Sequence, residues 1–117
     1  MTGVTTHVLD SNRGRPAPGV RIDVSVMEGG AWRLVRTLTT NADGRTDRPI
    51  VGADEVKVGE YQLEFHTGDY FRGLAGADEA QRFADDAVVR FSVYDVAQHY
   101  HVPLLCTPGS CTTYRGS

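Results

Sequence analysis

The stretch GVRIDVSVME at residues 19–28 alternates apolar and polar side chains with a period of two. Val20, Ile22, Val24 and Val26 fall on one side of an extended chain, and the polar residues between them fall on the other. Successive side chains of a β-strand point to opposite faces, so this pattern is typical of a strand that is buried on one face only. A chain built on such strands must pack one sheet face against another layer.

The same alternation recurs in GEYQLEFHTG at residues 59–68, and the stretches 4–11, 31–40, 87–95 and 99–105 are further candidate strands between turns rich in Gly, Pro and Asn. The GDYF segment at 68–71 is interpreted as a turn with aromatic core anchors. One helix is predicted over residues 78–84, with Asp78 as its N-cap and Gln81 completing a capping box. Many short strands and one short helix predict an antiparallel β-sandwich, and 117 residues predict a single domain over 1–117.

Charge and hydropathy exclude several function classes. The net charge of -3 has the wrong sign for binding nucleic acid. We find no apolar stretch as long as a membrane helix and no signal-peptide pattern at the N-terminus, so we expect a cytoplasmic protein without a membrane partner.

Cys106 and Cys111 are separated by Thr-Pro-Gly-Ser. A disulfide across this turn is conceivable, but a reducing cytoplasm favours free thiols. The pair alone has too few ligands for a zinc site.

A strand over 99–105 places His99 and His101 on the same face. Each could be a partly buried histidine bonded to backbone, or the two could bind a metal with His7 or His66 as a third ligand. No cysteine or carboxylate cluster accompanies the pair, so we expect no metal. Arg45, which follows the turn Asn-Ala-Asp-Gly, would on its own be a solvated charge.

Five motifs in order, THVLD (6–10), DGR (43–45), TGDYF (67–71), HYHVPLL (99–105) and TYRGS (113–117), resemble the 5-hydroxyisourate hydrolases, the transthyretin-like enzymes of urate degradation. The resemblance implies a sandwich of two four-stranded sheets with one short helix. It also implies a homotetramer whose active sites lie in a central channel between dimers, where assembly would order the C-terminal residues.

Within this resemblance the catalytic positions fall on His7, Arg45 and His101, and the substrate-binding positions on His7, Arg45, Tyr114 and Ser117. His99 ranks below His101 because carrier relatives can also have a histidine there. Cys106 and Cys111 depart from the usual family residues without touching a proposed catalytic position.

The alternative is a small-molecule carrier like transthyretin. Carriers have lysine, glutamate and threonine in place of His7, Arg45 and His101, and they lack the TYRGS ending, so the residues favour the enzyme. The resemblance implies hydrolysis of the 5-hydroxyisourate ring without a cofactor. His7 and His101 would hold and deprotonate water, and the charge of Arg45 would bind substrate and lower the histidine pKa values.

Overall fold

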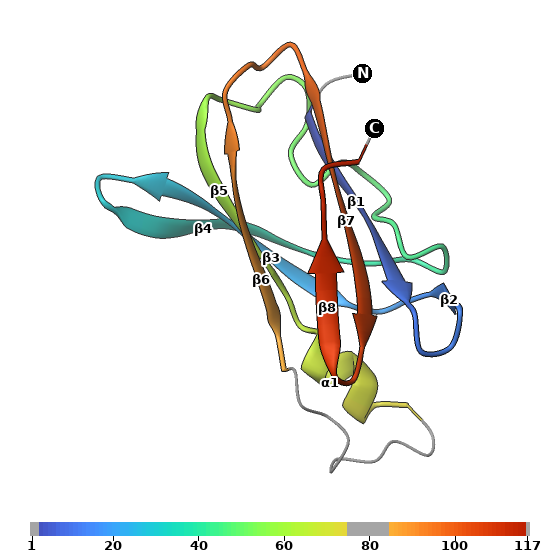
Figure 1. Cartoon of the computed structure of the whole chain (residues 1–117). Coiled ribbons are helices and arrows are strands. Elements are labelled where there is room, and N and C mark those ends of the chain that lie inside the picture. Colours follow the sequence, from blue (N-terminus) through green and yellow to red (C-terminus); the bar gives the residue numbers. More distant parts are fainter. Residues whose placement is uncertain (1–2, 75–84, 117) are drawn as a thin grey trace.

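The computed structural model describes residues 3–74 and 85–116, which form a sandwich of two four-stranded sheets (Figure 1). The first sheet has the order β2-β1-β7-β8, with β1 at Gly3–Asp10, β2 at Arg15–Pro16, β7 at His99–Thr107 and β8 at Ser110–Thr113. The second has the order β4-β3-β5-β6, with β3 at Arg21–Glu28, β4 at Ala31–Thr39, β5 at Gly59–Phe65 and β6 at Ala87–Val93. The predicted sandwich is confirmed.

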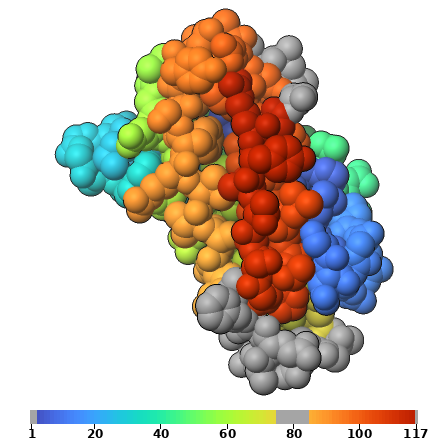
Figure 2. Space-filling view, in the orientation of Figure 1, coloured from blue at the N-terminus to red at the C-terminus, as the bar shows by residue number. Residues whose placement is uncertain are grey.

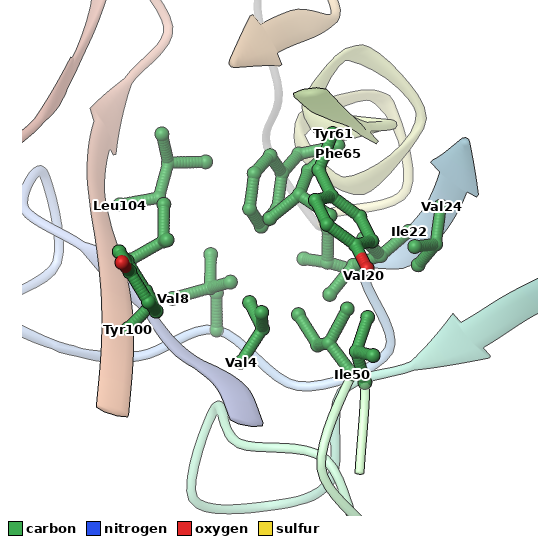
Figure 3. Packing of buried hydrophobic residues seen from close by; sticks show 14 of the residues in the cluster. Val4, Val8, Val20, Ile22, Val24, Ile50, Tyr61, Phe65, Tyr100 and Leu104 are labelled. Carbon is green, nitrogen blue, oxygen red and sulfur yellow. The ribbon is translucent and has the colours of Figure 1, made fainter. Parts of the chain in front are cut away.

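The core lies between the two sheets, where alternate residues of the strands meet (Figure 3). Val4, Val8 and Leu104 from the first sheet face Ile22 and Phe65 from the second, and all of them are buried. The period of two therefore identified the core face of β5 correctly, and that of β3 as far as Val24. The opposite, outer face of the first sheet does not contribute to this core.

Strand β1 pairs with β7 in parallel, whereas the other paired strands are antiparallel. In this register Thr5 lies beside His101 and His7 beside Pro103. The even-numbered residues of β1 are buried, and Thr5, His7 and Leu9 are half-buried on the outer face. His99 and His101 lie on that same face of β7, as the sequence predicted.

The GDYF segment is helical, so the prediction of a turn there was wrong. Helix α1 spans Thr67–Arg72, directly after β5. The predicted aromatic anchors are real: Phe71 is buried, and the Tyr70 hydroxyl donates to Asp10 Oδ2 at 2.8 Å. Burial and this carboxylate raise the pKa of Tyr70 to about 12. The helix predicted over 78–84 lies outside the described residues, and no described helix is long and apolar enough to span a membrane.

Cys106 and Cys111 form a disulfide, which corrects the expectation of free thiols. The two residues are direct neighbours across the antiparallel pair β7–β8, with their Cα atoms 4.2 Å apart. Thr107 and Ser110 beside them close the turn. The hairpin places the two thiols within bonding distance of each other.

Candidate active site

The outer face of β1 and β7 carries a hollow of about 430 Å³, which we name the histidine hollow. It brings together Arg45, His99 and His101 from two distant parts of the sequence. Its full lining is Thr5, Thr6, Arg45, Thr46, Asp47, Arg48, Pro49, His99 and His101. Two of the three predicted catalytic residues thus share one concave surface.

Arg45 is placed by a tight loop that rests on β1. Val8 N–H donates to Gly44 O at 2.7 Å, and Asn41 N–H donates to Arg45 O at 2.7 Å. Gly44 has a φ of +75°, and a Cβ at this position would lie 2.3 Å from Val8 O. Only glycine fits both the backbone conformation and the close approach. The glycine of the DGR motif therefore fixes the arginine that follows it.

His7 contacts the same loop. Its Nε2 lies 2.9 Å from Asp43 O. A carbonyl oxygen only accepts hydrogen bonds, so Nε2 carries the proton, and neutral His7 keeps Nδ1 free to accept one. His7 is not part of the histidine hollow lining.

The ring of His101 is held at both edges. On one side Nδ1 lies 2.9 Å from Thr5 Oγ1. On the other side, a Cβ added to Gly116 would lie only 2.6 Å from His101 Cδ2, so the backbone of Gly116 packs tightly against the ring. Burial, and then the charges of Arg45, His99 and His7, lower the pKa of His101. The expected effect of Arg45 is present at this histidine, although burial contributes most.

The C-terminal segment runs along β7 and is bonded to it (Figure 2). Gly116 N–H donates to His101 O at 2.8 Å. The Arg115 guanidinium donates to His99 O at 3.1 Å and lies 4.4 Å from the Tyr100 ring centroid. The described part of this tail is therefore bonded to β7 within one chain, whereas we expected assembly to order it.

Tyr114 lies apart from the histidine hollow and is 58% exposed. It lines a second hollow of about 260 Å³ between β6 and the C-terminal segment, and His101 lines both hollows. Ser117, the remaining predicted site residue, is outside the described residues.

His66 cannot serve as a third metal ligand for His99 and His101, because it follows β5 of the other sheet. There it forms, with Asp23 and Glu64, a group whose ligand atoms lie within 4.8 Å of one another. The Arg21 guanidinium lies 3.1 Å from His66 Nε2, so a positive charge already accompanies these carboxylates.

Comparison with known proteins connects this site to a family. A family model described as HIUase/Transthyretin family matches residues 4–116, nearly the whole chain. The chain belongs to the HIUase/Transthyretin family. A 5-hydroxyisourate hydrolase of Deinococcus radiodurans is 48% identical over 115 residues, which cover 98% of this chain and 96% of the relative.

Solved structures of the HIUase/Transthyretin family show the same fold. The 5-hydroxyisourate hydrolase of Klebsiella pneumoniae is 35% identical with a TM-score of 0.81, covering all of both chains. Transthyretin from Sparus aurata is 29% identical with a TM-score of 0.87, covering 99% of this chain and 97% of that one. Because a 5-hydroxyisourate hydrolase and a transthyretin share this fold, the fold alone does not distinguish them, and the side chains have to.

Sequence reasoning missed Thr5 and Gly116, the two residues that hold the His101 ring. Thr5 is two residues before His7, so the strand period already placed both on one face. The hydrogen bond between Thr5 and His101 depends on the parallel register of β1 and β7, which no local sequence pattern reveals.

Proposed function

We propose that the protein hydrolyses 5-hydroxyisourate, opening its six-membered ring at an amide bond. The observation that carries this proposal is the meeting of Arg45, His99 and His101 in one hollow, with the pKa of His101 lowered. The guanidinium of Arg45 can donate hydrogen bonds to an oxygen-rich ring, and a neutral imidazole can accept a proton from water. The two groups together suit the attack of water on a ring carbonyl. The names of the relatives support the same substrate.

In this mechanism a water molecule is held between His7 and His101. A histidine nitrogen accepts a proton from the water as its oxygen attacks the ring carbonyl. Arg45 donates hydrogen bonds to the carbonyl oxygen and stabilises the negative charge that develops there. The carbon–nitrogen bond then breaks, and the nitrogen takes the proton back from the histidine. The carbonyl carbon becomes a carboxylic acid, which releases its proton to solvent as the carboxylate of 2-oxo-4-hydroxy-4-carboxy-5-ureidoimidazoline.

Tyr114 and Ser117 are proposed to complete the substrate pocket, and we propose a homotetramer that places the pocket in a channel between subunits. The exposure of Tyr114 in one chain is consistent with a side chain that acquires neighbours on assembly. Sedimentation velocity should give the mass of four chains. The cytoplasmic location stays a prediction.

A direct assay tests the function. Urate oxidase generates 5-hydroxyisourate in the cuvette, and the ultraviolet decay of this intermediate is followed with and without the protein. We expect the protein to accelerate the decay. If the decay is unchanged and hormone-like aromatic ligands bind instead, the protein is a carrier.

We expect hydrolysis to be independent of metal ions, because the proposed base and electrophile are side chains. Activity after treatment with a chelator, followed by gel filtration into metal-free buffer, should equal that of the untreated protein. Loss of activity with recovery on addition of Zn²⁺ would instead make His99 and His101 metal ligands.

The lowered pKa of His101 predicts how the rate depends on pH. Protonation inactivates a base, and a lowered pKa means that protonation requires more acid. The acid side of the kcat/KM profile should therefore have its midpoint below about 6.5, the ordinary histidine value. In Arg45→Gln, an NMR titration should show the pKa of His101 moving up towards that value. A midpoint above it in the wild-type protein would contradict the assignment.

A further inference from the structure

Thr5 lies between the two histidines of the hollow. Its Oγ1 is 2.8 Å from His99 Nε2 and 2.9 Å from His101 Nδ1. The two imidazole rings have centroids 6.2 Å apart and are tilted by 32°, so the hydroxyl is the atom that connects them. The parallel register creates this arrangement, because Thr5 is the direct neighbour of His101.

A hydroxyl has a single hydrogen to donate, and this limits the protonation states of the two rings. Within residues 3–74 and 85–116, Thr5 Oγ1 has these two ring nitrogens as its side-chain hydrogen-bond partners. If the hydroxyl donates to one ring, it accepts an N–H from the other. Two neutral rings therefore have two ordered arrangements, which run in opposite directions.

The two directions differ at Nε2 of His101. If Thr5 donates to His101 Nδ1, the proton of His101 sits on Nε2, and that nitrogen cannot accept another. If His101 Nδ1–H donates to Thr5, then Nε2 is free, and the hydroxyl donates onward to His99 Nε2. Only the second direction leaves His101 with a basic nitrogen away from Thr5.

We propose that Thr5 is a positioning residue that, together with His99, holds His101 in the Nδ1–H tautomer and so presents Nε2 as the base. This role rests on the proposed hydrolysis, because hydrolysis needs that base. The hydrogen-bonded bridge from His99 through Thr5 to His101 rests on the interatomic distances alone. It also gives His99 a role: it accepts the hydroxyl hydrogen and does not touch the reacting atoms.

The packing around the ring supports this role. Gly116 forms an isolated β-bridge with His101, and the space that a Cβ on Gly116 would need is occupied by Cγ and Cδ2 of the His101 ring. A half-turn of the ring about the Cβ–Cγ bond would put Cδ2, which forms no such hydrogen bond, in the place of Nδ1, so the bond to Thr5 itself favours the observed ring orientation. With the ring fixed, the direction of the Thr5 hydroxyl decides which nitrogen is free.

The test combines nitrogen NMR of the histidine rings with kinetics. In wild-type protein at a pH where His101 is neutral, ¹⁵N shifts should show the proton on Nδ1. Thr5→Val keeps the shape of the side chain and removes the hydroxyl. It should shift His101 towards the Nε2–H tautomer and lower kcat by at least about tenfold, the scale for removing an orienting partner of a functional histidine. KM should change far less, and Thr5→Ser should restore both the tautomer and kcat.

Thr39→Val is the matched control, because Thr39 is an exposed threonine on β4 of the other sheet. It should change neither the tautomer of His101 nor kcat. A wild-type His101 with its proton on Nε2 overturns the proposal, and so does a Thr5→Val protein with wild-type tautomer and kcat. If the wild-type protein does not hydrolyse 5-hydroxyisourate, the proposed function fails, and the NMR spectrum still decides whether the bridge exists and in which direction it runs.

Discussion

Arg45→Gln, His101→Gln and His7→Gln are each expected to lower kcat/KM by about two orders of magnitude or more, the scale for loss of an electrostatic or acid–base group. Arg45 and His101 meet in the histidine hollow, and the charge of Arg45 acts on His101. His7 is held by Asp43 O of the loop that carries Arg45. All three side chains are on the outer face of the first sheet or on that loop, so their loss should leave the core between the sheets intact.

The measurement is steady-state hydrolysis of freshly generated 5-hydroxyisourate, with thermal unfolding as the check on folding. Arg33→Gln is the matched control, because Arg33 is an exposed arginine on β4 whose partner is Glu28 at 2.7 Å. It should retain wild-type activity. His99→Ala should be milder than His101→Ala, and the opposite order would exchange the roles of the two histidines.

Deletion of residues 114–117 is expected to abolish hydrolysis while the sandwich remains folded. Tyr114 and Arg115 are exposed, so the core loses little apolar contact. The deletion removes Tyr114 from the second hollow, the Gly116 N–H that bonds His101 O, and the backbone that packs against the His101 ring. We expect a small shift in Tm and no measurable acceleration of the decay of 5-hydroxyisourate.

Gly116→Ala isolates the contact with the ring. The new methyl group would start 2.6 Å from His101 Cδ2, so the ring or the tail must move. Activity should fall with little change in Tm. Gly109→Ala is the control, because a Cβ there meets only Thr107 Oγ1 at 3.8 Å. If both the deletion and Gly116→Ala keep wild-type rates, the tail is not part of the site.

The alternating strands were predictable because their pattern records burial directly. Tyr61, Leu63 and Phe65 of β5 are buried as predicted. Ile22 and Val24 of β3 are buried as predicted too. The pattern failed where β3 and β4 slip in register between Val24 and Ser25, which leaves the polar Ser25 buried. Such a slip depends on the partner strand and leaves no local signature.

Helix α1 escaped prediction because it has only six residues, too few to show a helical period, and has no side-chain cap. The site was predicted one residue at a time, through the resemblance. The hollow itself depends on the loop at Gly44 and on the parallel pair β1–β7, which bring Thr5 and His101 together across 96 positions of sequence. Long-range pairing of this kind cannot be derived from local patterns.

A ribosome releases β1 long before it releases β7. Until His99–Thr107 has been synthesised, β1 can pair on one edge only, with β2, Gly44 and Val51, and its other edge presents unpaired N–H and C=O groups. Closing so long a loop is slow, because its entropy cost precedes the contacts that compensate for it. The nascent chain therefore exposes an edge that other nascent chains could pair with. A chain that stops before His99 has the open edge without the two histidines that β7 contributes to the histidine hollow.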